Sequence, residues 1–158
     1  MSLTVEHVQL VLGESNQRVT VLDDVSFNVK PSSLTAVVGP SGAGKSSLLA
    51  VCGGLRTPTG GSVSIDGVVI SDLTPAARTR IRRDQIGFVF QQSNLVPALT
   101  AIDQLLLLVH LQGRRPTKMD RQRALALLDE VGISNLMDRR PNQLSGGEQQ
   151  RVGIARAL

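Results

Sequence analysis

Hydrophobic and polar residues alternate along the first part of the chain. The alternation at 3–11 and 21–29 predicts two strands, because successive side chains of a strand point to opposite faces. In the second strand, alternate positions place five residues on one face: Val21, Asp23, Val25, Phe27 and Val29. Two short apolar runs, at 34–38 and 86–90, are typical of further strands, the first of them buried on both faces.

Turn and capping residues mark the remaining elements. Asp66-Gly67 separates 63–65 from 68–70 and predicts a hairpin. Helices are predicted over 45–55, from Thr74-Pro75 onward, over 103–112, over 117–131 and from Ser145 to the end of the chain. Strands and a glycine-rich segment therefore come first, and a mainly helical region follows from about residue 91.

Composition narrows the classes of protein that fit this pattern. The 158 residues carry a net charge of +4, and the densest basic run, 78–83, alternates with other residues, which favours a solvated helix face. No nucleic-acid-binding motif accompanies it, so no nucleic-acid partner is expected. Cys52 is the single cysteine, which excludes an intrachain disulfide. No signal-peptide pattern is visible, and the longest apolar run, 105–109, is too short to cross a bilayer. Any membrane association is therefore expected to come through a partner.

A glycine-rich loop is the first candidate site. It consists of Gly39, Pro40, Ser41, Gly42, Ala43, Gly44, Lys45 and Ser46, with Ser47 beside it. The loop fits the pattern G-x-x-x-x-G-K-[ST] and is followed by a predicted helix. Glycines let backbone N–H groups approach a polyphosphate, and the positive end of the helix faces the anion. We expect Lys45 to contact the β- and γ-phosphates and the Ser46 hydroxyl to bind Mg²⁺.

The segment LSGGEQQR, at 144–151, is the second candidate site. Ser145 followed by Glu148 predicts a capping box at the start of a helix. A capping box does not account for the glycines at 146 and 147, because glycine in the first turn costs helix stability. The pair indicates that a ligand such as a phosphate approaches this helix N-terminus closely.

The sequence LSGGEQQRVGIARAL, together with the phosphate loop, resembles the ATP-binding-cassette family, whose commonest signature is LSGGQ. The resemblance covers the whole chain, including GLRTPTGGSVSIDG and IGFVFQ, whose Gln91 matches the glutamine of the family's Q-loop. FVFQ at 88–91 followed by NLVP at 94–97 is similar to the subgroup of lipoprotein-releasing, macrolide-exporting and cell-division ATPases.

The resemblance implies a fold class and a division of the chain. The fold is α/β, with a P-loop NTPase (RecA-like) core, an antiparallel β subdomain and an α-helical subdomain. Residues 1–90 would form the antiparallel β and P-loop core, 91–143 the helical subdomain, and 144–158 the signature motif with its helix.

The resemblance also implies two ATP molecules with Mg²⁺ in a head-to-tail dimer. The P-loop of one subunit and the signature motif of the other would enclose each ATP. Ser145, Gly146, Gly147 and Glu148 would contact the nucleotide bound by the partner. Gln91 would be a catalytic residue that contacts Mg²⁺ and the attacking water. A membrane permease would be the second partner, which places the protein in the cytoplasm on the inner face of the cell membrane.

One position departs from the family's pattern. The family usually carries an aromatic residue near the end of the first strand to stack on adenine, and the corresponding residue here is Leu12. Leucine makes apolar contact but does not stack, so we expect weaker discrimination between ATP and GTP. His7 and His110 match no motif and are interpreted as ordinary strand and helix residues.

The family also expects, beyond the signature helix, an apolar strand ending in Asp-Glu, a D-loop and a switch histidine. The sequence given ends at Leu158 and contains none of them. It is therefore interpreted as the N-terminal portion of the domain, incomplete at the C-terminus. We expect these residues alone to bind ATP without turnover and to be poorly soluble.

Three functions stay open at this point. The first is the ATP-binding subunit of a bacterial transporter, with 91–100 supplying an apolar surface for the permease. The second is a soluble or regulatory ATPase of the same family, of the cell-division or DNA-repair type. The third is a non-catalytic remnant. Co-purification with a permease would separate the first from the second.

Overall fold

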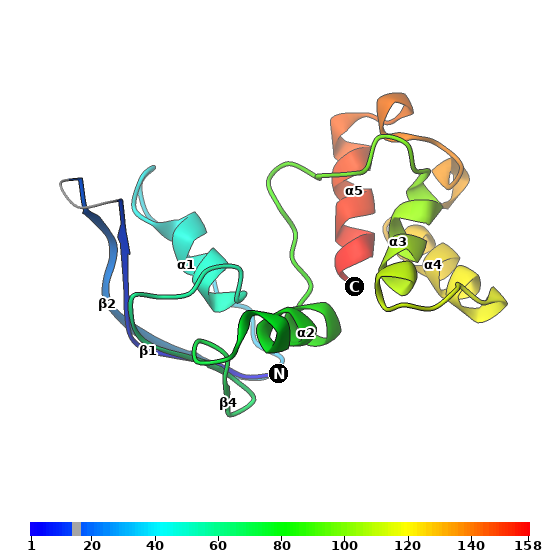
Figure 1. The fold of residues 1–158 in the computed structure, drawn as a ribbon. Helices are drawn as coiled ribbons and strands as arrows, with labels where there is room; N and C mark the ends of the chain where they lie inside the picture. The colour runs from blue at the N-terminus through cyan, green and yellow to red at the C-terminus, as the bar shows by residue number, and fades with distance from the viewer. Residues whose placement is uncertain (14–16) are drawn as a thin grey trace. The chain divides into compact units, whose positions relative to one another are not determined.

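The computed structural model describes residues 1–13 and 17–158. The chain divides into two compact units, Met1–Ile86 and Gly87–Leu158, which are described separately below. Figure 1 shows strands and two helices in the first unit and helices in the second.

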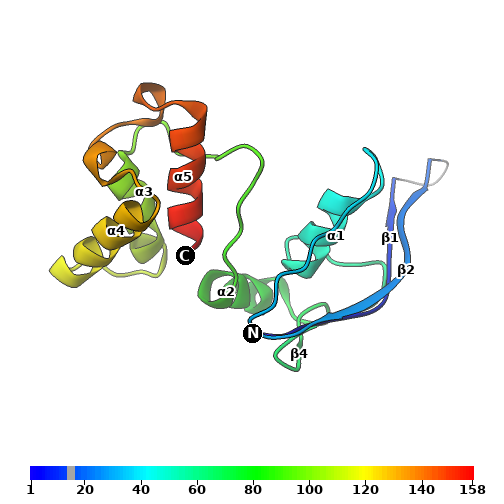
Figure 2. The same ribbon diagram turned by 180° about the vertical axis from the view of Figure 1, so that it is seen from behind.

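A four-stranded antiparallel sheet forms the base of the first unit. Its strands are β1 (Leu3–Leu12), β2 (Val19–Val29), β3 (Gly60–Ile65) and β4 (Val68–Val69), in the order β2-β1-β3-β4. The predicted hairpin is confirmed: Asp66 and Gly67 have φ of 46° and 81°, as a tight two-residue turn requires. The two helices are α1 (Lys45–Cys52) and α2 (Pro75–Gln85). Leu48 and Val51 of α1 pack into the same apolar core as the strands, and the reverse view in Figure 2 shows α1 beside β1 and β2.

An irregularity in β1 and β2 changes which side chains of β2 face the core. His7 and Asp24 both have positive φ, 50° and 49°, and the register shifts at this point. Leu22 is buried before the irregularity, and Val21, Val25 and Phe27 pack against the core, whereas Asp23 is exposed. The predicted face from Val21 to Val29 is therefore present with Asp23 as its polar exception, and Leu22 is buried in addition to it. A Cβ on Gly61 would lie 2.2 Å from the His7 carbonyl oxygen, so β3 can pass this irregularity only with glycine there.

Neither apolar run predicted as a further strand forms one. Residues 34–38 and 86–90 have no strand assignment, and within the described residues the sheet is made of β1–β4. Leu34 and Val38 are 100% and 86% exposed, so burial on both faces is also wrong for the first run. An apolar run becomes a strand only where a neighbouring strand supplies hydrogen-bond partners, and the run itself does not encode that neighbour.

Three helices and two short 3-10 turns form the second unit. The helices are α3 (Ala101–Leu111), α4 (Lys118–Glu130) and α5 (Gly146–Ala157), and the turns are η1 (Ser134–Leu136) and η2 (Pro141–Gln143). All three predicted helices are confirmed, each with a hydroxyl side chain at its N-cap: Thr100, Thr117 and Ser145. The core is built from one apolar stripe of each helix, and Leu128 and Val152 are completely buried in it.

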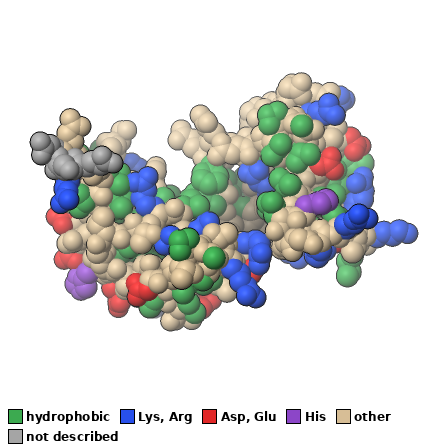
Figure 3. All heavy atoms as spheres, in the orientation of Figure 1, with side chains coloured by type: hydrophobic (Ala, Val, Ile, Leu, Met, Phe, Trp, Pro, Cys, Tyr) green, Lys and Arg blue, Asp and Glu red, His purple; other side chains and the backbone are tan. Residues whose placement is uncertain are grey.

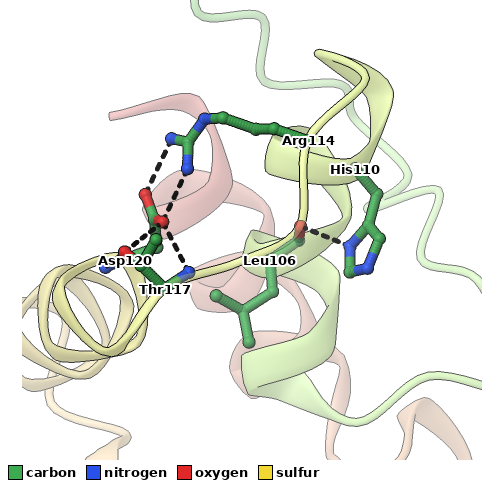
Figure 4. A network of polar contacts seen from close by, with 5 residues as sticks. All are labelled: Leu106, His110, Arg114, Thr117 and Asp120. Carbon is green, nitrogen blue, oxygen red and sulfur yellow. Dashed lines mark hydrogen bonds and ion pairs between the residues drawn. The ribbon is translucent and has the colours of Figure 1, made fainter.

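The connection between α3 and α4 is held by a small polar network, drawn in Figure 4. Both terminal nitrogens of Arg114 donate to the carboxylate of Asp120, at 2.7 and 2.8 Å. The same carboxylate accepts the backbone N–H of Thr117, which completes the capping box of α4. These donors hold the pKa of Asp120 below its usual range, first of all the Arg114 guanidinium. In the same view, the Nδ1 of His110 contacts the Leu106 carbonyl one turn earlier in α3.

Basic side chains collect around this connection. Residues 114–123 contain Arg114, Arg115, Lys118, Arg121 and Arg123. Figure 3 shows a group of blue side chains at its right edge, where the α3–α4 connection lies. Asp120 is the one acidic residue among residues 114–123, so this stretch forms a positively charged surface.

Candidate nucleotide-binding site

The phosphate loop lies at the N-terminus of α1, as the sequence predicts. Lys45 is the first residue of the helix, and its Nζ donates to the carbonyl oxygens of Gly39 (2.8 Å) and Pro40 (2.6 Å). The ammonium group is thus held inside the curve of its own loop. Ser46 lies in the first turn of α1 and is exposed, so its hydroxyl is accessible to a ligand. A cation and a helix N-terminus at one place form a site suited to an anion.

Backbone conformation gives this loop its shape. Gly39, Gly42 and Gly44 all have positive φ, at 151°, 83° and 82°. A Cβ on Gly44 would lie 2.6 Å from the carbonyl oxygen of Val21 in β2, whereas one on Gly42 would meet nothing within 4 Å. Gly44 is therefore required both by its conformation and by the packing of the loop against β2. At Gly42 only the conformation requires glycine.

The signature segment forms the N-terminus of α5. Ser145 is the N-cap: its backbone N–H donates to Glu148 Oε2 at 2.7 Å, and its Oγ accepts the Glu148 N–H at 3.4 Å. The predicted capping box is present. The N–H donated by Ser145 is the main reason that the pKa of Glu148 lies below its usual value. Gly146 and Gly147 are exposed, and a Cβ on either would meet nothing within 4 Å. Space for a ligand is therefore present at this helix end.

Gln91 lies in the second unit, near the signature segment. A cavity of about 440 Å³ in this unit has nine lining residues: Gln91, Gln92, Ser93, Asn94, Leu95, Pro141, Gly146, Gln149 and Gln150. The structure therefore brings Gln91 and the signature glycine Gly146 to one cavity, although 55 positions separate them in the sequence (146 minus 91). Gln149 and Gln150 lie within the signature segment, but the sequence predicts no role in the site for either side chain. Their position one turn into the helix that the capping box predicts could have drawn attention to them.

Leu12 is the last residue of β1 and pairs with Val19 of β2. Its side chain is half-buried and packs against the apolar core of the first unit. One side of the Leu12 side chain thus contacts the core, and the other side offers an apolar surface that cannot stack on a base.

The histidines do not belong to either group of site residues. The Nδ1 of His7 pairs with the Asp24 carboxylate at 2.7 Å on the exposed irregularity of the sheet, and His110 contacts the backbone of α3. Within residues 1–13 and 17–158, no group of His, Cys, Asp and Glu side chains could hold a metal ion by itself. Cys52 is buried in the first core, and burial raises the pKa of its thiol to about 11.

The site residues therefore fall into two groups. The phosphate loop, with Lys45 and Ser46, belongs to the first unit, and Gln91 with the signature segment belongs to the second.

Comparison with known proteins identifies the family of this chain. The family model described as ABC transporter matches residues 22–158. The chain belongs to the ABC transporter family.

Relatives and solved structures agree with this assignment. The chain is 42% identical to the lipoprotein-releasing system ATP-binding protein LolD 1 of Rhodospirillum rubrum, over 99% of this chain and 69% of that protein. It is 42% identical to LolD 1 of Chlorobium chlorochromatii (89% and 57%) and 44% identical to LolD of Pseudomonas fluorescens (92% and 63%). The chain thus spans between 57% and 69% of the length of these curated relatives.

Among solved structures, the ATP-binding cassette MJ0796 matches with a TM-score of 0.91 and 40% identity, over 99% of this chain and 68% of that one. It was solved as a dimer in a post-hydrolysis state with ADP and Pi bound. The α/β cassette fold and the predicted family and subgroup are therefore confirmed. As for membrane spans, the described helices of this chain are all too short or too polar to cross a bilayer.

Proposed function

We propose that this chain is the ATP-binding part of a bacterial ABC transporter of the lipoprotein-releasing type. The observation that carries the proposal is the open N-terminus of α5: Ser145 caps it, and Gly146 and Gly147 leave free space in front of its first amides. A terminal phosphate fits such a helix end, because N–H groups and the helix dipole both favour an anion. The identity to LolD proteins supports the transport role.

The phosphate loop would bind the β- and γ-phosphates of ATP. The Nζ of Lys45 donates to two carbonyl oxygens of the loop, at 2.8 and 2.6 Å, so its positive charge lies within the loop that would surround the phosphates. Ser46 supplies an exposed hydroxyl in the first turn of α1, and Gln91 an exposed amide oxygen. These neutral oxygen donors suit Mg²⁺, which keeps several waters and takes further oxygens from phosphates. Mg²⁺ would neutralise charge on the phosphates, and Gln91 would orient the attacking water.

We propose a head-to-tail dimer as the active form. The P-loop and the signature segment of one chain would then serve different ATP molecules, with Ser145, Gly146, Gly147 and Glu148 contacting the nucleotide of the partner. The dimer of MJ0796 supports this arrangement. Closure on ATP and opening after hydrolysis would be a shift between two populations driven by the ligand.

A membrane permease is the proposed second partner, with the protein peripheral on the cytoplasmic face of the membrane. The segment 95–99 supports this idea, because the side chains of Val96 and Pro97 are exposed. The side chain of Gln104 holds the segment in place through hydrogen bonds to the backbone N–H and carbonyl of Val96. We further propose the three-part organisation 1–90, 91–143 and 144–158, in which the middle part faces the permease. Co-purification of the native protein with a permease supports the transporter; a soluble ATPase of the same family would purify without one.

Nucleotide binding tests the proposal directly. Lys45→Ala should reduce ATP affinity about a hundredfold, because a charge-assisted contact to phosphate is lost. Lys118→Ala is the matched control, since Lys118 is an exposed lysine at the start of α4. Its ATP affinity should equal that of the wild type. Equal affinities for all three proteins would overturn the proposed role of the loop.

A further inference from the structure

The segment that carries Gln91 has no regular structure of its own. Residues 86–100 contain neither helix nor strand, yet several of their backbone groups form hydrogen bonds. At residues 96–99 the side-chain partner is Gln104 of α3, whereas at residues 90–94 the partners come from α5, the helix that begins with the signature motif. The path of this segment is therefore set by a few side chains.

Two residues of α5 hold the backbone on either side of Gln91. Gln150 donates its Nε2 to the carbonyl of Phe90 at 3.2 Å. Arg156 donates Nη2 to the carbonyl of Ser93 at 2.9 Å and Nη1 to that of Asn94 at 3.2 Å. Gln91 lies between these points, with its own side chain exposed.

Gln149 links the same segment to the residues just before the signature motif. Its Nε2 donates to the carbonyls of Pro141 (2.9 Å) and Leu144 (3.1 Å), and its Oε1 accepts the hydroxyl of Ser93 at 3.4 Å. The Cα of Ser93 also lies 3.9 Å from the position that a Cβ on Gly153 would take, so the segment lies close against α5. A methyl group at 153 would be in ordinary van der Waals contact with Ser93.

Arg156 is well suited to this task. The planar guanidinium has several N–H donors in a fixed fork and can serve two carbonyl groups at once, whereas lysine is a single flexible donor. The side chain is partly buried, and desolvation lowers the pKa of its guanidinium. The guanidinium nevertheless stays charged, because an arginine pKa lies far above neutral pH.

We propose that Gln149, Gln150 and Arg156 are positioning residues that tie the Gln91 segment to the signature helix. Through them, Gln91 and the Ser145–Gly147 end of α5 move as one body. A displacement of Gln91 at the chain's own ATP would then reach the signature motif, which contacts the ATP of the partner. This inference rests on the proposed function, and it adds a link between the two ATP sites within one chain.

The test compares Arg156→Met with Arg123→Met in the full-length native protein. Arg123 is an exposed arginine on α4 of the same unit, outside the candidate site, and serves as the matched control. Cleavage by chymotrypsin after Phe90 or Leu95 should become about tenfold faster in Arg156→Met, because the backbone carbonyls of this segment lose two charge-assisted hydrogen bonds and the segment opens more often. ATP turnover should fall by about tenfold in kcat with KM unchanged, since the P-loop is untouched. Arg123→Met should change neither quantity.

A second variant keeps the test valid if Arg156→Met does not fold. Gln150→Met removes one donor to the carbonyl of Phe90, so cleavage of this segment should become about threefold faster. Arg156→Lys should lie between wild type and Arg156→Met, because it keeps the charge and loses the fork. An unchanged cleavage rate in Gln150→Met and in every folded Arg156 variant would overturn the inference, as would a rise in KM at constant kcat. A wild-type protein that binds no ATP would instead overturn the proposed function, and the cleavage result would still decide the positioning role.

Discussion

The two units position their candidate site residues by different means. In the first unit, backbone conformation does most of the work: three glycines with positive φ shape the loop, and Lys45 is held by carbonyls of that same loop. In the second unit, side chains do it: a serine and a glutamate cap α5, and glutamines and an arginine hold the Gln91 segment. The P-loop of the first unit should therefore be sensitive to any added Cβ. The signature helix and the Gln91 segment of the second unit should be sensitive to the loss of single polar side chains.

The largest effect is expected from Gly44→Ala in the first unit. Alanine there combines an unfavourable φ of 82° with a Cβ 2.6 Å from the Val21 carbonyl oxygen, so loop or strand must shift. Gly42→Ala has the same φ problem, at 83°, and no clash. Left-handed conformation alone costs an alanine about 1–2 kcal/mol, which lowers the population that keeps this loop conformation by about five- to thirtyfold.

ATP titration by calorimetry checks this pair. Gly44→Ala should bind ATP at least about tenfold more weakly than Gly42→Ala, because the clash adds to the conformational cost. If both variants bind equally, packing against β2 does not shape the loop, and the contrast between the units is weaker than we describe.

Leu12→Phe should raise the affinity for ATP, because it adds an aromatic side chain near the loop that binds phosphate through its backbone. An aromatic ring can stack on adenine, which is worth about 1–3 kcal/mol per base in nucleic-acid systems, or about five- to a hundredfold. The wild type should bind ATP and GTP within about threefold of each other, because Leu12 has no ring. Fluorescence titration of both nucleotides measures this. A strong ATP preference in the wild type would contradict the role given to Leu12.

Removing the N-cap hydroxyl from two helices of the second unit distinguishes an effect on stability from an effect on ligand binding. Ser145→Ala and Thr117→Ala each remove a hydroxyl that caps a helix, so each should lower the free energy of unfolding by about 1 kcal/mol. Only Ser145 lies in the signature motif, so only Ser145→Ala should also weaken ATP-dependent dimerisation. Denaturant unfolding and analytical ultracentrifugation measure the two effects. Equal dimerisation of both variants would remove Ser145 from the site.

The smallest effect is expected from the pH dependence of the α5 cap. The pKa of Glu148 is lowered in the folded chain from the unfolded value of 4.5, because Ser145 donates to the carboxylate. A lowered pKa means that the contribution is fully present above about pH 5 and is lost as the pH falls through the folded value. The difference in Tm between wild type and Glu148→Gln should therefore shrink on acidification from pH 6 to about pH 3. A difference that is constant over this range would contradict the ionised capping box.

The sequence predicts local features of this chain better than those that depend on distant neighbours. The cap at Ser145 and the turn at Asp66-Gly67 follow from residues within four positions, and both are confirmed. The runs 34–38 and 86–90 required strand neighbours that their own residues do not specify, and they form no strands.

Prediction of the candidate site shows the same limit. The glycine pattern of the P-loop and the capping box of the signature motif are visible in the sequence, because each lies in one short segment. The contacts of Gln150 and Arg156 with backbone carbonyls span 60 to 63 positions, and no periodicity or composition marks them. The irregularity at His7 and Asp24 is equally hidden, since it depends on two strands meeting out of register.

Mixing two inactive variants tests the central claim most directly, namely that each chain gives its P-loop and its signature motif to different ATP molecules. Lys45→Ala and Ser145→Arg should each fail to trap ATP in a homodimer, because both sites of the dimer carry the defect. In mixed dimers, one site combines both defects and the other is intact. With random pairing about half of the dimers are mixed, so the account predicts about one trapped ATP per mixed dimer. Mixed dimers that trap no ATP would contradict it.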